Sequence, residues 1–334
     1  MSGPLDPHAL GDRPLEIWAV SDGRAGIEAQ AVGLAEAVAR LTPAQTTIKH
    51  VGWPRWMRRT PSALIVAPLQ MLARGSDPIA PPWPDLWIAN GRAAIPLSIG
   101  VRRWSHGRTF VVQLQDPLRS SHRFDLVVPP NHDGLTGPNV FPITGTPHRV
   151  TPERLQRELE PFRSRLDPLP GPRVAVLIGG KSKAFDLSPA RAKTLADQIE
   201  RAVRASGGSL MLTFSRRTPG DAKAIMIERL RGLPGWIWDG EGANPYFAFL
   251  AAADYILVTE DSANMPTEAG ATGRPVYLLG MDGKQARKQR FHAELARLGV
   301  ARRFEGRLES WSYPPLRETD RVAAEILRRI GRTV

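Results

Sequence analysis

Short apolar runs alternate along this chain with longer segments of helical periodicity. In the first half, residues 15–20 form an apolar run that predicts a buried strand, and Ala31, Leu34 and Val38 share one face of a helix expected over 27–41. Further strands are predicted at 46–51, 85–89, 109–114 and 125–128, and helices near 61–73 and 92–104. This alternation favours a parallel sheet with helices on both faces. Residues 129–152 are rich in Pro, Gly and Asn and are predicted to be loop.

The same pattern restarts after residues 166–172, where three prolines indicate an interdomain linker. Strands are predicted at 173–178, 209–214, 235–238, 255–258 and 276–279. Helices are predicted at 188–206, 219–231, 245–252, from Ser262, at 284–298 and at 318–332. The chain is therefore predicted to be α/β, with two Rossmann-like doubly wound domains facing a cleft. The predicted parts are a disordered tail (1–14), an N-terminal domain (15–165), a C-terminal domain (172–317) and a last helix (318–334) that packs back on the N-terminal domain.

The segment 255–275 is the most informative part of the sequence. An apolar strand stops at Thr259, and Asp261 or Ser262 can cap the helix that follows. This helix carries Glu268 about two turns from its start and is expected to end at Gly273. A helix N-terminus directly after a strand offers free N–H groups to a phosphate, and a carboxylate further along can bind a ribose diol. The segment therefore predicts half of a nucleotide site.

Other strand-end loops of the second half are expected at the same edge, because parallel strands end together. They supply glycine N–H groups, hydroxyls, cations and an amide. The predicted nucleotide-sugar-binding residues are Gly180, Lys181, Ser182, Lys183, Ser215, Arg216, Arg217, Asn244, Asp261, Ser262 and Glu268. Each has a plainer explanation when taken alone, since Gly-Gly after a strand is usually a tight turn and an Arg-Arg pair is usually solvated. The prediction depends on all of them lying at the strand ends of one domain.

Composition limits the function classes. The chain has 334 residues, of which 42% are hydrophobic and 23% charged, as in a folded globular protein. It contains no cysteine, which excludes disulfides and thiolate chemistry. The net charge of +12 fits a cleft for phosphates, a surface for anionic lipid or simply solvated arginines. Because no nucleic-acid-binding motif accompanies the charge, no nucleic acid partner is expected. No secretory signal and no membrane-spanning apolar run are evident, so we expect a cytoplasmic protein, either free or peripheral on the cytoplasmic face of the inner membrane.

Several short motifs carry a resemblance to a known family. They are Ser-Asp-Gly-Arg-Ala-Gly at 21–26, Val-Pro-Pro-Asn-His-Asp at 128–133, Ser-Arg-Arg-Thr-Pro at 215–219, Asn-Pro-Tyr at 244–246 and Val-Thr-Glu-Asp-Ser-Ala-Asn-Met at 258–265. Together they resemble the ELM1 family over about residues 15–330. That family has bacterial members of unassigned role and a plant member linked to mitochondrial fission. Its first loop usually has a His where this chain has Ile27, which puts catalytic activity in question.

The segment 261–275 is also similar to the donor-binding segment of the peptidoglycan N-acetylglucosaminyltransferase. This likeness implies a GT-B-like glycosyltransferase fold, in which the N-terminal domain binds the acceptor and the C-terminal domain binds a nucleotide sugar such as a UDP-sugar. It places Glu268 on the ribose-binding carboxylate and Ser262 near the diphosphate. We therefore expect a glycosyltransferase with an unknown, lipid-linked or envelope-glycan acceptor. A non-catalytic adaptor of the ELM1 type with a GT-B fold is the alternative.

Sugar transfer needs a stabilised diphosphate leaving group and a base for the acceptor hydroxyl. No two aspartates stand two residues apart, so the Asp-x-Asp metal site of metal-dependent transferases is missing, and no metal or other cofactor is expected. Lysines and arginines near a helix N-terminus can neutralise the leaving group instead. The candidate catalytic residues are Asp22, then Asp116 and His132, whose plainer roles are Asx-turns and a loop hydrogen bond. A dinucleotide-dependent epimerase is disfavoured, because Gly-x-Gly-x-x-Gly and Tyr-x-x-x-Lys are both missing.

The prediction of a membrane-docking surface for the acceptor rests on residues in the first half of the chain. Residues 53–59 and 64–72 mix Trp, Arg and apolar side chains, which is typical of a patch that docks on an anionic membrane. An amphipathic core helix with an arginine rim explains the same pattern.

Overall fold

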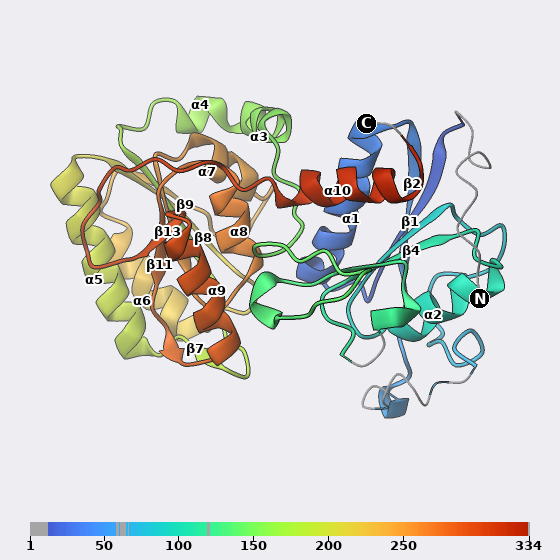
Figure 1. The fold of residues 1–334 in the computed structure, drawn as a ribbon. Coiled ribbons are helices and arrows are strands. Elements are labelled where there is room, and N and C mark those ends of the chain that lie inside the picture. The colour runs from blue at the N-terminus through green and yellow to red at the C-terminus, as the bar shows by residue number, and fades with distance from the viewer. Residues whose placement is uncertain (1–12, 58–59, 61–64, 66, 119–120, 333–334) are drawn as a thin grey trace. The chain divides into compact units, whose positions relative to one another are not determined.

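The computed structural model describes residues 13–57, 60, 65, 67–118 and 121–332. The chain divides into two compact units, Met1–Arg149 together with Arg317–Val334, and Val150–Leu316 (Figure 1). Most of the tail predicted to be disordered, residues 1–14, lies outside the described residues. Arg13 is described, and its guanidinium pairs with the carboxylate of Asp85 at 2.5 Å.

The first unit is built on a parallel sheet with the strand order β2-β1-β3-β4-β5. The strands are β1 (Leu15–Ser21), β2 (Ala44–His50), β3 (Leu86–Asn90), β4 (Phe110–Leu114) and β5 (Leu126–Val128). The three strands β3, β4 and β5 are buried along their whole length, as expected where helices cover both faces. The order reverses between β1 and β3, which makes their carboxyl ends the switch point of this sheet.

Helices cover both faces of this sheet. On one face α1 (Ala25–Leu41) and α10 (Glu318–Arg329) share a core with the sheet, and α2 (Ile95–Trp104) packs on the other. The last helix α10 contacts α1 although about 280 residues separate them, as the pair Arg40–Asp320 illustrates. Short 3-10 turns complete the unit at Arg55–Met57, Ser121–Arg123 and Asn131–Asp133.

One predicted helix of this unit is wrong where the structure describes it. Residues 67–73, the second part of the helix expected at 61–73, form turns and irregular backbone. Pro68 explains the failure, because proline cannot donate the hydrogen bond that a helix interior requires. Most of the first part, residues 61–64 and 66, lies outside the described residues.

The second unit has a parallel sheet with the order β13-β11-β10-β6-β8-β9. Its strands are β6 (Arg173–Ile178), β8 (Ser209–Phe214), β9 (Gly235–Ile237), β10 (Tyr255–Thr259), β11 (Val276–Leu279) and β13 (Ala301–Arg303). Numbered along the chain, this is the 3-2-1-4-5-6 order of doubly wound nucleotide-binding sheets, read from the other edge. The reversal lies between β6 and β10. The edge strand β13 has no counterpart in the sequence prediction.

The helices of this unit are α3 (Pro152–Leu159), α4 (Arg163–Leu166), α5 (Pro189–Ser206), α6 (Gly220–Leu230), α7 (Tyr246–Ala252), α8 (Asn264–Gly270) and α9 (Ala286–Arg297), with a 3-10 turn at Glu160–Phe162. A separate ribbon pairs β7 (Phe185–Asp186) with β12 (Asp282–Gly283). The predicted boundary after residue 165 is displaced. Because α3 packs on α7, the second unit begins at Val150 and not after the proline-rich stretch 166–172.

Within the residues described, none of the helices combines the length and the apolar character needed to cross a bilayer.

Candidate functional site

The switch point of the second sheet brings two strand ends together. Leu177 of β6 lies beside Val258 of β10, so Gly179 and Thr259 leave the sheet next to each other. The N–H of Gly179 donates to Thr259 Oγ1 at 2.7 Å. Ligands of doubly wound sheets bind outside the carboxyl ends of the strands at this reversal. The sequence motifs of the second half are therefore gathered where such a ligand would bind.

Asp261 organises this junction. Its side chain is fully buried and accepts hydrogen bonds from the Thr259 hydroxyl at 2.8 Å and from the Gly180 N–H at 3.2 Å. Arg217 approaches the same carboxylate at 3.5 Å. A Cβ added at Gly179 would lie 2.0 Å from Asp261 Oδ1, so only glycine allows this contact. Of the two residues expected to cap the helix, Asp261 does not do so, because its carboxylate is directed back to the loop after β6.

The loop after β8 is fastened to the same place. The Lys181 N–H donates to the Arg217 carbonyl at 3.0 Å, and the Thr218 hydroxyl donates to the Gly179 carbonyl at 2.6 Å. Ser215 accepts the Arg217 N–H through its hydroxyl at 3.1 Å. Arg216 is exposed and has no ion-pair partner among the described residues. The loops after β6, β8 and β10 thus form one hydrogen-bonded platform.

The predicted lysines of the β6 loop differ in their surroundings. Lys181 forms an ion pair with Asp186, which raises the pKa of the lysine and lowers that of the aspartate through the hydrogen bond between them. Ser182 accepts the Phe185 N–H at 3.1 Å and so shapes the turn. Lys183 is exposed and, in the part of the chain that the structure describes, has no carboxylate partner. Lys183 is therefore the more available cation of the two.

Glu268 lies on α8, which begins at Asn264, and the Ser262 hydroxyl accepts the Met265 N–H at 3.4 Å. The Glu268 side chain is mostly buried, with 7% of the residue exposed, and accepts the Tyr246 hydroxyl at 2.5 Å. Burial, together with the negative charge of Glu268, raises the pKa of Tyr246 well above its ordinary value. Asn244 accepts the Tyr246 N–H at 3.0 Å and so places this tyrosine at the start of α7. One oxygen of the predicted ribose-binding carboxylate is thus occupied by a neighbouring phenol.

The candidate catalytic residues of the first unit are engaged in local contacts. Asp22 accepts the Arg24 N–H at 3.2 Å and pairs with its guanidinium at 2.6 Å. Asp116 accepts the Leu118 N–H at 2.6 Å. His132 Nε2 lies 3.8 Å from the Asp133 carboxylate, in the 3-10 turn after β5. The Asx-turn explanation of both aspartates is therefore realised in the structure.

The family model described as mitochondrial fission ELM1 matches residues 25–330. The chain belongs to this family. The Mitochondrial fission protein ELM1 of Arabidopsis thaliana is 33% identical over 275 residues, which cover 74% of this chain and 64% of the plant protein. The chain thus spans less than two thirds of that relative. The uncharacterized protein RP120 of Rickettsia prowazekii is 27% identical and covers 94% of this chain and 98% of its own length.

Among solved structures, the UDP-GlcNAc 2-epimerase of Methanocaldococcus jannaschii matches with a TM-score of 0.55 over 94% of this chain and all of its own. The identity of 12% limits this likeness to the fold. It confirms the predicted fold class, a GT-B-like chain of Rossmann-like domains, and the family match confirms the predicted ELM1 resemblance.

Three residues around this candidate site were not predicted from the sequence. Thr259 and Tyr246 hold Asp261 and Glu268, and their roles depend on contacts that no local motif displays. Lys288 on α9 lies within electrostatic range of Asp261 and Arg217, and its burial lowers the pKa of its ammonium to about 8. A basic run at 284–290 was the available signal for Lys288. In the first unit, a pair between His50 and Glu28 was also missed.

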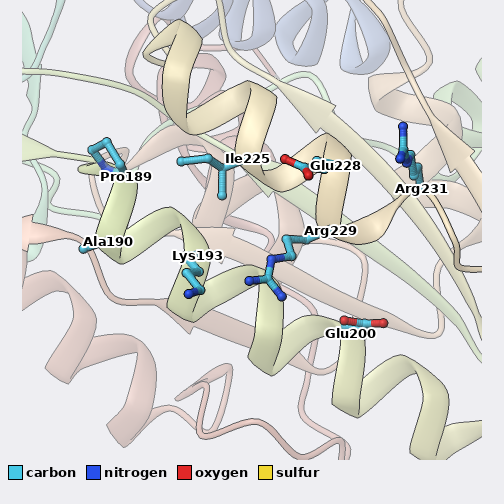
Figure 2. A pocket seen from close by; sticks show the side chains of 8 residues that line it. All are labelled: Pro189, Ala190, Lys193, Glu200, Ile225, Glu228, Arg229 and Arg231. Atoms are coloured by element: carbon cyan, nitrogen blue, oxygen red, sulfur yellow. The ribbon is translucent and has the colours of Figure 1, made fainter.

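Two other surfaces contain none of the predicted nucleotide-sugar-binding residues. A surface groove between α5 and α6 is lined by Lys193, Glu200, Glu228 and Arg229 and contains none of the predicted site residues (Figure 2). The predicted membrane patch is only partly exposed. Trp53 is buried and donates its indole N–H to the Ala93 carbonyl at 3.1 Å, whereas Trp56 is 78% exposed. Residues 58–59, 64 and 66 of that patch lie outside the described residues.

Proposed function

We propose that the second unit binds a nucleotide sugar and that the chain is a glycosyltransferase that uses it as donor without a metal. The observation that carries this proposal is the platform at the β6–β10 reversal, where three strand-end loops are fastened around Asp261. A platform of this kind at the switch point of a sheet in the 3-2-1-4-5-6 order suits a nucleotide diphosphate. The Methanocaldococcus jannaschii protein of the same fold acts, by its name, on UDP-GlcNAc, so UDP-sugars are the first ligands to test.

In this proposal the diphosphate lies over the platform, near the Gly180 loop, Ser182 and Ser262. Lys183, Arg216 and Arg217 supply positive charge, while Lys181 is held by Asp186. Asp261 acts through position and not by contact, because an anionic carboxylate would repel a phosphate. Cations and N–H groups fixed in advance stabilise the charge that the leaving diphosphate develops.

The ribose of the nucleotide is assigned to Glu268, and its nucleobase is assigned to the loop that contains Asn244. One Glu268 oxygen accepts the Tyr246 hydroxyl, so the ribose hydroxyls would share this carboxylate with the phenol or displace it. The general base that deprotonates the acceptor hydroxyl is assigned to the first unit. Its candidates are Asp22, Asp116 and His132. For Asp22 this role requires that its ion pair with Arg24 opens when the acceptor binds.

The test is a thermal-shift screen against UDP, GDP, CMP and dTDP and their sugars. We expect a shift for one nucleotide family, and calorimetry then gives its Kd. Glu268→Gln removes the charge but keeps an acceptor for Tyr246, and we expect roughly tenfold weaker nucleotide binding, as for one lost charge-assisted hydrogen bond. Glu228→Gln, in the groove between α5 and α6, is the matched control. A screen without any shift, or equal affinities in the two variants, would argue against the proposed site.

A second candidate is a non-catalytic adaptor that keeps the fold. It is favoured because Asp22 is paired with Arg24 and Asp116 accepts the Leu118 N–H. The plant relative's name, a mitochondrial fission protein, favours it as well. Release of free nucleotide from a bound nucleotide sugar distinguishes the two, since transferases commonly pass sugar slowly to water. Binding without any release, also with crude envelope glycan as acceptor, would favour the adaptor.

Attachment to an anionic membrane belongs to the same proposal and rests on the exposed Trp56. Trp56→Ser should reduce flotation with anionic liposomes, whereas Trp53 is unsuitable for this test because it is buried. Equal flotation of wild type and variant would end the membrane part of the proposal.

A further inference from the structure

The carboxyl edge of the first sheet contains a buried amide in a row of apolar side chains. Asn90 is the last residue of β3 and lies on the same face as Leu86 and Ile88, which belong to the core shared with α1. Asn90 continues this row and is fully buried. The order of the sheet reverses between β1 and β3, so Asn90 lies at its switch point.

The hydrogen bonds of Asn90 fix the orientation of its amide. The Nδ2 group donates to the Ile27 carbonyl at 2.9 Å and to Gln30 Oε1 at 2.8 Å. A flipped amide would place its oxygen against these two acceptors, so the flipped orientation is excluded. Among the described residues, nothing donates a hydrogen bond to the buried oxygen, Asn90 Oδ1. A buried acceptor without a donor lowers stability, and a ligand that supplies the donor removes that cost.

The groups around Asn90 belong to the loops that follow the neighbouring strands. Gln115 follows β4 and donates its side-chain N–H to Gln30 Oε1 at 3.3 Å. It has a φ of +66°, which a residue with a side chain rarely adopts. Gly91 follows Asn90 directly, and a Cβ added there would lie 3.8 Å from Asp22 Oδ2. Asp22, Gly91 and Gln115 are half-buried, so Asn90 lies directly beneath partly exposed groups.

These groups favour a ligand with hydroxyl groups over a charged ligand. Asn90 Oδ1 requires a donor, and a phosphate or carboxylate would place its own oxygens against it. A metal cation is disfavoured, because the Arg24 guanidinium already lies 2.6 Å from the Asp22 carboxylate. A sugar hydroxyl donates a hydrogen bond and carries no charge, and it therefore fits this edge.

We infer that Asn90 is the central residue of a sugar-binding subsite at the switch point of the first sheet, where its Oδ1 accepts one hydroxyl group of the acceptor. The inference rests on the proposed function, because the sugar is taken to be the acceptor of the proposed transfer. It narrows the acceptor to a compound that presents a hydroxyl-bearing sugar at this edge. It also places that sugar next to Asp22, the first candidate for the general base.

The experiment is saturation-transfer NMR on the full chain, with the methyl glycosides of glucose, galactose, mannose and N-acetylglucosamine as probes. Titration of the glycoside that binds best gives its Kd, and its monodeoxy derivatives show which hydroxyl contributes. Asn90→Ala removes the acceptor oxygen. Asn139→Ala is the matched control, because the Asn139 amide also donates to two oxygens within the first unit, the carbonyls of Ser121 and Phe124.

We expect Asn90→Ala to weaken glycoside binding by about fivefold to tenfold, as for one lost hydrogen bond, and Asn139→Ala to leave it within about twofold. Removal of one particular hydroxyl should weaken binding to the wild type by a similar factor and have no further effect in Asn90→Ala. A merely structural role of Asn90 would instead weaken the binding of every derivative alike.

Three results would overturn the inference. They are no glycoside binding by the wild type, equal Kd values in wild type and Asn90→Ala, as expected if Oδ1 holds only a water molecule, and additive effects of Asn90→Ala with every deoxygenation. If Asn90→Ala does not fold, hydrogen exchange of the wild type with saturating glycoside decides. Slower exchange at 90–92 and 115–118 would support the subsite, and unchanged exchange there would overturn it.

A titration with UDP separates this result from the proposed function. If UDP does not bind but a glycoside binds through Asn90, the nucleotide part of the proposal fails and the sugar subsite stands. If UDP binds and Asn90→Ala leaves glycoside binding unchanged, the nucleotide site stands and the role of Asn90 falls.

Discussion

The two sheets of this chain have similar architecture but different chemistry at their carboxyl ends. In the first unit the polar groups at the strand ends are paired locally, Asp22 with the Arg24 guanidinium and Glu28 with the His50 ring. In the second unit the strand-end loops are fastened around one buried carboxylate, Asp261, while Lys183 and Arg216 are exposed and form no ion pair among the described residues.

This difference indicates which edge is prepared for an anion. A paired edge gains little from a charged ligand, because binding must first break an existing ion pair. An edge with exposed cations that form no ion pair gains electrostatic energy when an anion binds, because no existing pair has to break. This contrast supports the proposed binding of an anionic ligand by the second unit.

The largest effect is expected for Gly179→Ala. The new Cβ would lie 2.0 Å from the Asp261 carboxylate, so the junction must open. We expect a loss of about 2–3 kcal/mol of stability, together with the loss of nucleotide binding. Urea unfolding and calorimetry measure both. Gly220→Ala, which has open space at its Cβ, should change stability by less than about 1 kcal/mol. Equal effects of the two substitutions would show that the junction is not tightly packed.

Asp261→Asn should have the next largest effect. The asparagine amide would direct its N–H group at the Gly180 N–H or the Thr259 hydroxyl, which now donate to the carboxylate. Arg217 would also lose the negative charge that it approaches. We expect about 1–3 kcal/mol of destabilisation in urea unfolding. Asp167→Asn, at an exposed pair with Arg163, should cost less than about 0.5 kcal/mol. An equal loss of stability in the two variants would contradict the organising role of Asp261.

Lys288→Met should stabilise the free protein at neutral pH. The pKa of Lys288 is about 8 in the folded protein and 10.5 for the free side chain, so the unfolded chain binds the proton more tightly. Wild-type stability should therefore gain a contribution as pH rises from about 8 to 10.5, and the variant should lack it. We expect a Tm a few degrees above wild type at pH 7, and a difference that shrinks by pH 10. A lower Tm in the variant at pH 7 would mean that Lys288 has a partner in the free protein.

The smallest effect is expected in the first unit, at Glu325 of α10. Hydrogen bonds from Arg328 and Arg329 lower its pKa to about 2. The stabilisation is therefore fully present above about pH 4.5 and is lost as pH falls towards 2. Because the arginines are partly exposed, Glu325→Gln should cost less than about 1 kcal/mol at pH 7. Urea midpoints at pH 7 and pH 3.5 should show this cost decreasing. A larger destabilisation by Glu325→Gln at pH 3.5 than at pH 7 would contradict the pairing of Glu325 with Arg328 and Arg329.

Sequence patterns predicted most of the fold. The strands at 173–178, 209–214 and 276–279 agree with the structure to the residue, because each is an apolar run with turn residues nearby. The failures have physical reasons. Pro68 interrupts the expected helix at 61–73, and β13 is a short edge strand whose Arg302 and Arg303 conceal it. The boundary moved because the packing of α3 on α7 is a tertiary contact.

The candidate site was predictable only as a set of strand ends. Parallel strands end together, so the loops carrying Gly180, Ser215 and Asp261 were expected at one edge. The contacts between them were not predictable, since Asp261 and Gly180 are 81 residues apart in the chain. Lys288 was hidden for the same reason, because the ribbon that positions α9 joins segments almost a hundred residues apart.

Hydrogen exchange with and without saturating UDP tests the central claim most directly. We predict slower exchange in the second unit at 179–183, 215–218, 259–268 and 284–288, and unchanged exchange in the first unit at 22–24, 90–92 and 115–118. Protection confined to the segments of the first unit, or no protection in either, would contradict the assignment of the nucleotide to the second sheet.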